Sequence, residues 1–179
     1  MGRDKALLEF SGETLVERAV RKLGKVCSEV GIAGGGDALR MYGRVVPDGT
    51  GGCGPLGGIV AALETTFCDW SLFLAVDVPL VPAELLRRLG ERCLESSGVA
   101  VMVRVEGRAE PLCAGYNRRA LEVLRAELAA GHWKVTQAIA AAGAVEYLEV
   151  SGMETEWLMN VNTPEEFRVA ERRAADVGI

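Results

Sequence analysis

Short apolar runs alternate with longer, helix-like segments along most of this chain, and this alternation constrains the fold more than any other feature. The segments of strand length, apolar in whole or in part, fall at residues 30–33, 44–46, 71–76, 99–103, 112–116 and 145–150. Helices are predicted beside them at residues 14–25, 56–66, 82–93, 118–130 and 135–142. Such an order is typical of a mostly parallel sheet with helices on both faces. Because 179 residues suit one folding unit, we predict a single α/β domain over residues 1–179.

Two capping boxes mark where helices should begin. Thr14 and Glu17 have the spacing of the first box. Thr163 and Glu166 have the spacing of the second, and Pro164 stands at the first helical position. We therefore expect one helix to begin after residue 14, and a last helix to run from residue 164 to about residue 175.

Aspartates follow two of the predicted strands. The run 71–76 is apolar throughout, which is typical of a strand that is buried on both faces, and Asp77 comes directly after it. In open α/β sheets ligands bind beyond the carboxyl ends of the strands. A carboxylate there can bind Mg²⁺, which is usually held by one or two carboxylates and substrate phosphates. The alternative is an aspartate that caps the turn at Pro79. Asp48, which follows run 44–46, is a second candidate or simply a turn residue before Gly49.

The glycine-rich loop at residues 49–54 matches the pattern GxGxxG. A dinucleotide-binding loop should pass directly from the first strand into a helix, but here Pro47 and Asp48 intervene. A loop that passes close to a ligand and ends at Gly54, where Pro55 begins a helix, is the better interpretation. The free amides and positive dipole at that helix end favour a phosphate or base oxygen.

Three further polar residues lie where a ligand could meet the chain. Lys5 is a candidate phosphate partner, or a solvated surface lysine. Asn160 and Asn162 flank Val161 at the end of a short predicted strand, residues 159–161. Asparagines there also commonly satisfy turn backbone, and Asn162 could support the cap at Thr163.

Charge and composition exclude several classes of function. The net charge is −5, which argues against a nucleic-acid surface, since such a surface needs clustered Lys and Arg. The five cysteines form no CxxC pair, so reduced thiols are expected rather than disulfides or a zinc site. The longest apolar run, 72–76, is too short to span a membrane, and no signal peptide is recognisable. We therefore expect a cytoplasmic protein without membrane contact.

Five segments, in order along the chain, resemble the molybdenum cofactor guanylyltransferase family. Residues 1–8 are similar to the second half of its nucleotide signature, which runs into RMG-x-DK. The others resemble its GPLAG segment, its strand-end CD-x-P, its P-x-x-A-x-Y strand and its closing N-x-NTPEE; they lie at residues 54–58, 76–79, 111–116 and 160–166. Each match is modest alone, but together they cover nearly the whole chain.

The resemblance implies a three-layer α/β/α, Rossmann-like nucleotidyltransferase that joins GMP from GTP to the phosphate of molybdopterin and releases pyrophosphate. It implies Mg²⁺ as cofactor, GTP and molybdopterin as substrates, and contacts with cofactor-synthesis and recipient enzymes. Lys5 would hold nucleotide phosphate and Asp77 the metal, and both would be catalytic. Asp48 and Gly54 would line the guanosine pocket, and Asn160 and Asn162 would lie on the pterin side.

The family pattern begins with a strand ending in LAGG, whereas Met1 falls on the methionine of RMG. The first strand and the glycine half of the loop are therefore expected to be missing from this sequence. Either the start is misassigned or the form is truncated, and the chain as given should bind GTP poorly or be unstable. The alternatives are a related cytidylyltransferase, another nucleotidyltransferase, a non-catalytic nucleotide-binding module and, least favoured, a Rossmann oxidoreductase.

Overall fold

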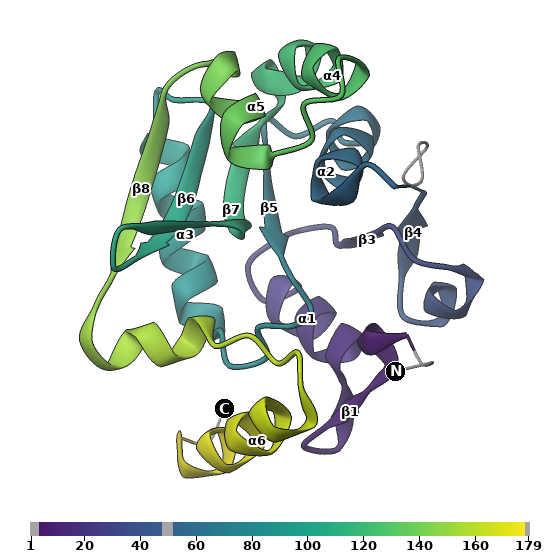
Figure 1. Cartoon of the computed structure of the whole chain (residues 1–179), viewed down its shortest axis with the longest axis vertical. Helices are drawn as coiled ribbons and strands as arrows, with labels where there is room; N and C mark the ends of the chain where they lie inside the picture. Colours follow the sequence, from purple (N-terminus) through teal and green to yellow (C-terminus); the bar gives the residue numbers. More distant parts are fainter. Residues whose placement is uncertain (1–3, 48–51, 178–179) are drawn as a thin grey trace.

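A four-stranded sheet forms the centre of the computed structural model, which describes residues 4–47 and 52–177. Its strands follow the order β5–β7–β6–β8, with bounds Trp70–Leu74, Arg108–Asn117, Ala100–Val105 and Val145–Val150. β7 pairs antiparallel with both β5 and β6, whereas β6 and β8 are parallel. The α/β class is confirmed, and the sheet is mixed: β5, β6 and β8 share one direction and β7 runs against them (Figure 1).

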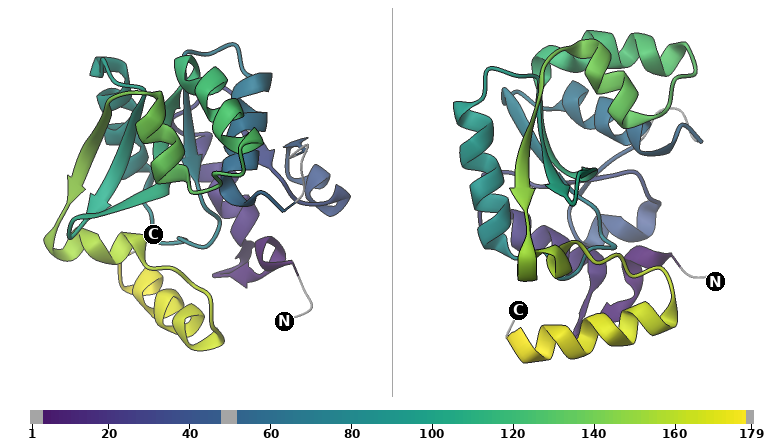
Figure 2. Two further views of the ribbon diagram at one scale, coloured as in Figure 1. Left: turned by 45° about the horizontal axis from the view of Figure 1, so that its top comes forward. Right: turned by 60° about the vertical axis from the view of Figure 1, so that its left-hand side comes forward.

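Helices cover both faces of this sheet, as the three-layer prediction requires. In the right-hand view of Figure 2 the sheet lies between α3, Ala83–Glu95, and a second layer that contains α4, Leu121–Ala129, and α5, Val135–Ala142. Strand β6 shows why both layers form. Its residues alternate between the faces, so that Met102 packs in the core with α4 and α5 while Val101 and Val103 pack with α3.

A second, smaller sheet lies beside the first. β3, Gly31–Ala33, pairs in parallel with β4, Arg44–Val46, and the 3-10 helix η2, Asp37–Met41, connects them. Helix α2, Gly54–Thr65, packs against both strands and also contributes to the core beside α4 (Figure 1). Among the described residues, no strand is hydrogen-bonded between this pair and β5.

The prediction that residues 71–76 are buried on both faces was wrong in one respect. All five residues of β5 are half-buried, although four of the five are apolar. Strand β5 pairs with β7 along one edge only, so its other edge gains no cover from a neighbouring strand.

The ends of the chain pack together below β5. The 3-10 helix η1, Lys5–Leu7, is followed by a hairpin of β1, Glu9–Phe10, and β2, Glu13–Thr14, and by α1, Leu15–Leu23. The expected capping box at Thr14 and Glu17 is present, since each side chain accepts the other residue's backbone N–H. Helix α6, Pro164–Val177, returns to this region, where Phe167 meets Phe10 edge-to-face at 5.3 Å.

The segment before α6 also differs from expectation. The predicted strand at residues 159–161 is not a strand; the chain leaves the 3-10 helix η4, Gly152–Leu158, and reaches α6 through an extended connection. A single backbone bond, from the Val161 N–H to the Asp77 carbonyl at 2.8 Å, joins this connection to the segment after β5. One such bond does not extend the sheet, but it fixes the two segments side by side. No helix in the described part of the chain is long and apolar enough to cross a bilayer.

Candidate active site

Three of the predicted site residues meet although they are far apart in sequence. The Lys5 ammonium lies 3.2 Å from Oδ2 of Asp77 and 2.6 Å from Oδ1 of Asn162. The side chains of Lys5 and Asp77 are 32% and 28% exposed, so a ligand can reach both. These residues come from η1, from the turn after β5 and from the connection that precedes α6.

Local structure places Lys5 at this point. Asp4 caps η1 by accepting the Ala6 N–H at 3.1 Å. The Ala6 side chain is buried against Val16 of α1 and Leu39 of η2. The short helix is therefore fixed on α1, and the Lys5 side chain extends from it toward Asp77.

Asp77 lies in a turn that is tied down on both sides. Its carbonyl accepts the Val161 N–H, and the Val78 side chain is buried in the core beneath α3. Two residues further on, the carbonyl of Pro79 accepts hydrogen bonds from Arg18 and Lys22 of α1. The carboxylate thus projects from a backbone segment whose carbonyls are held by two other parts of the fold.

The second capping box positions Asn162. The Glu166 carboxylate accepts the backbone N–H groups of Asn162 and Thr163 at 2.9 and 2.8 Å, and the Thr163 hydroxyl accepts the Glu166 N–H. These backbone hydrogen bonds lower the pKa of Glu166, so the carboxylate stays charged at neutral pH. The box predicted from sequence to start α6 therefore also fixes the backbone of Asn162.

The two oxygen atoms that contact the Lys5 ammonium are of the kind that bind a small divalent cation. A carboxylate oxygen and an amide oxygen already hold one cationic group between them, and Mg²⁺ prefers oxygen ligands in small number, completed by water and substrate phosphate. In the described residues, no three His, Cys, Asp or Glu side chains gather into a metal-binding group. Asp77 and Asn162 together present two oxygen atoms that could take part in holding Mg²⁺.

Gly54 and Asn160 are not among the hydrogen-bond partners of the Lys5 ammonium. Gly54 begins α2 with a φ of +63°, beside β3 and β4, and Cys53 precedes it as the N-cap. Asn160 is half-buried in the connection before Val161. Asp48 lies outside the described residues, as does much of the glycine-rich loop.

Two buried cations beside the Asp77 turn were not predicted from the sequence. Arg18 and Lys22 are each only 3% exposed, although cations are rarely buried. A signal did exist, because Leu15, Arg18 and Lys22 follow the i, i+3, i+7 spacing of one helix face. The charge of the two side chains argued against a buried position. Hydrogen bonds to the Pro79 carbonyl, and for Arg18 also the ion pair with Glu13, stabilise that position.

The two buried cysteines are poor nucleophiles. Burial raises the pKa of both Cys93 and Cys113 to about 12, so both stay protonated at neutral pH. Burial also raises the pKa of Cys27. None of these three thiols is among the partners of the Lys5 ammonium.

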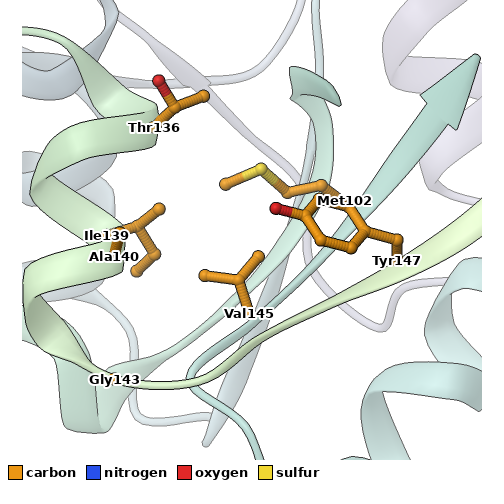
Figure 3. Close-up of a pocket in the computed structure, with 7 residues that line it drawn as sticks. All are labelled: Met102, Thr136, Ile139, Ala140, Gly143, Val145 and Tyr147. Carbon is orange, nitrogen blue, oxygen red and sulfur yellow. The ribbon is translucent and has the colours of Figure 1, made fainter. Parts of the chain in front are cut away.

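A cavity of about 180 Å³ lies elsewhere, between α5 and the outer strands of the sheet. Figure 3 shows Ile139 and Thr136 of α5 on one side and Met102, Val145 and Tyr147 on the other. Apart from the Tyr147 and Thr136 hydroxyls its lining side chains are apolar. Its lining includes no cation that could bind a phosphate and no carboxylate that could bind a metal, so it is not the site that the sequence predicted.

Comparison with known proteins identifies relatives of the chain. A probable molybdenum cofactor guanylyltransferase from Pelotomaculum thermopropionicum is 38% identical over 138 residues, which are 75% of this chain and 66% of that protein. Another from Opitutus terrae is 35% identical over 182 residues and covers 97% of this chain and 89% of that protein.

A similar fold occurs in the crystal structure of molybdopterin-guanine dinucleotide biosynthesis protein A from Archaeoglobus fulgidus. It superimposes with a TM-score of 0.82 and 23% identity, covering 98% of this chain and 92% of that one. The model of the MobA-like NTP transferase domain matches residues 1–144, most of the chain. The chain therefore belongs to the family of MobA-like NTP transferase domains.

Proposed function

We propose that this nucleotidyltransferase transfers GMP from GTP to the phosphate of molybdopterin and releases pyrophosphate. Membership of the family supports nucleotidyl transfer, and the names of the curated relatives support guanine and the molybdenum cofactor. One observation assigns the proposed reaction to particular residues: Lys5, Asp77 and Asn162 contact one another beyond the end of β5. That position is where open α/β sheets bind their ligands.

The chemistry explains why a cation and two oxygen donors suffice. The attacking phosphate oxygen and the α-phosphate of GTP are both anionic, so positive charge between them lowers the repulsion and stabilises the transition state. When bound, Mg²⁺ would neutralise phosphate oxygens and orient them. Asp77 would hold the metal, and the Lys5 ammonium would bind nucleotide phosphate. No protein nucleophile is needed for this displacement.

The resemblance implied that Asn162 lies on the pterin side, but its contact with Lys5 favours a role beside the cation. Its Oδ1 lies 2.6 Å from the same ammonium that contacts Asp77, which supports Asn162 as a second oxygen donor to the cation. Asn160, two residues earlier, remains the candidate on the pterin side. For the guanosine we propose Asp48 and Gly54, because Gly54 begins α2 and helix N-termini present free amides to phosphate or base oxygens.

A radiometric transfer assay tests the proposal. The purified chain is incubated with molybdopterin, Mg²⁺ and GTP labelled at the α-phosphate, and the labelled dinucleotide is separated by chromatography. Asp77→Asn and Lys5→Met should each lower the rate by about 100-fold or more, because the first weakens the proposed metal ligand and the second removes a positive charge beside the phosphates. Omitting Mg²⁺ or adding a chelator should abolish transfer.

Asp69→Asn is the matched control, because Asp69 is exposed and lies at the opposite end of β5. It should keep the full rate. Transfer from CTP in place of GTP would contradict the proposed base. A fully active Asp77→Asn variant would contradict the proposed metal ligand.

A further inference from the structure

Two basic side chains of helix α1, Arg18 and Lys22, are buried and donate hydrogen bonds to the same backbone carbonyl. Arg18 donates from Nε to the Pro79 oxygen at 2.9 Å, and Lys22 donates from Nζ to the same oxygen at 2.6 Å. Both residues are almost completely buried. The space between them and residues 74–79 has no volume for a water molecule, so in this structure water does not replace either donor.

Such an arrangement is costly unless it is compensated. Two like charges share one small volume, and desolvation of a cation alone costs several kcal/mol. Arg18 is partly compensated by Glu13, at 2.7 Å from its Nη1, and by the ring of Phe10, whose centroid lies 4.9 Å away. The Lys22 ammonium is directed at the Pro79 carbonyl. A methionine or leucine at residue 22 would avoid this cost, so packing alone gives no reason for a lysine.

The Pro79 carbonyl belongs to the same turn as Asp77. Between the two, Val78 is buried, and its carbonyl accepts the Val81 N–H at 3.3 Å. The Asp77 carbonyl is held from the other side by the Val161 N–H. The position of the Asp77 carboxylate therefore depends on two anchors, one in the connection before α6 and one in α1.

We propose that Arg18 and Lys22 are positioning residues that fix the turn carrying Asp77. This inference rests on the proposed role of Asp77 as metal ligand. With the carbonyl of Pro79 held, the carboxylate keeps its place beside Lys5 and Asn162, and less order has to be gained when metal and nucleotide bind. Neither side chain touches the reacting groups, so their effect is through the backbone.

Amide hydrogen exchange by NMR tests the proposal without relying on turnover. The variants are Lys22→Met, Arg18→Met and the double variant; Lys22→Arg, which keeps a cationic donor, tests for rescue. The Val161 amide, which donates to Asp77, should exchange about tenfold faster in the double variant, because its acceptor has lost the second anchor. Lys22→Met should give a smaller increase and Lys22→Arg almost none.

Arg21→Met is the matched control. Arg21 lies on the same helix and binds Glu13, but its side chain is 45% exposed and contacts the carboxylate rather than Pro79. Its replacement should leave the exchange of the Val161 amide unchanged. Unchanged exchange in the double variant, or an equal increase at amides throughout the helices, would overturn the proposal and assign the two cations a purely structural role.

A second readout is the Mg²⁺ concentration that gives half the maximal transfer rate. It should rise about tenfold in the double variant, with a smaller change in the KM for GTP, because the anchored carboxylate holds the metal. If the wild-type chain transfers no GMP, the proposed function fails, while the exchange measurement still decides whether α1 positions the turn. An unchanged Mg²⁺ requirement in an active double variant would count against the inference.

Discussion

Replacing Lys22 by methionine should change how the stability of this protein depends on pH. Burial, reinforced by the charges of Arg18 and Arg21, lowers the pKa of Lys22 from 10.5 to about 7. The negative charge of Glu13 partly offsets this by raising the pKa of Lys22, and the charge of Lys25 lowers that pKa slightly further. Above pH 7 the unfolded chain therefore keeps a proton that the folded protein has released. Stability from this residue falls as the pH drops from about 10.5 to about 7.

The magnitude follows from the two pKa values. Between about pH 7 and about pH 8.5, the unfolded chain keeps its proton at Lys22 while the folded protein passes from half-protonated to neutral. Integrating that difference gives about 1.5 kcal/mol of added stability for the wild type at the higher pH. Methionine is similar in length and does not titrate, so the variant lacks this increase.

Urea unfolding followed by circular dichroism, at several pH values across this interval, measures both proteins. The free energy of unfolding of the wild type minus that of the variant should increase by about 1.5 kcal/mol as the pH rises from about 7 to about 8.5. Arg87→Met, an exposed change on α3, should run parallel to the wild type. If Lys22→Met also runs parallel, the pKa of Lys22 is not lowered in the folded protein, and the reasoning about its burial fails.

Two further changes test the packing of the sheet and the support of α6. Gly115→Ala should destabilise the protein by about 1–3 kcal/mol, because the new Cβ would lie 2.2 Å from Sγ of Cys93. Urea unfolding measures this loss. A second change, Cys93→Ala, made in the same variant should recover part of the lost stability. Glu166→Gln should lower the thermal midpoint at neutral pH, because backbone hydrogen bonds from Asn162 and Thr163 lower the pKa of this carboxyl. This stability is present above the ordinary pKa of 4.5 and is lost as the pH falls through the lower folded value, so the two midpoints should converge in acid.

The local signals of the chain determined much of the fold. Capping chemistry acts over a few residues, so the boxes at Thr14 and Thr163 marked the starts of α1 and α6 correctly. The predicted segments matched β3 to β8, because side-chain burial leaves its period in the sequence, but the segment 159–161 forms no strand and the hairpin of β1 and β2 was not predicted. Strand direction was less accessible: β7 follows β6 through a tight hairpin at Glu106 and Gly107, both with positive φ, and so runs against its neighbours.

For the candidate site too, some features were predictable from the sequence and others were decided only by the tertiary structure. Asp77 was found from sequence because its place after an apolar run is a local property. That Lys5, Asp77 and Asn162 meet depended on the packing of η1, the β5 turn and α6, and the half-buried state of β5 depended on which strands pair with it. The roles of Arg18 and Lys22 were decided by tertiary structure alone, because a buried cation is stable only where a distant group, here the Pro79 carbonyl, accepts its hydrogen bonds.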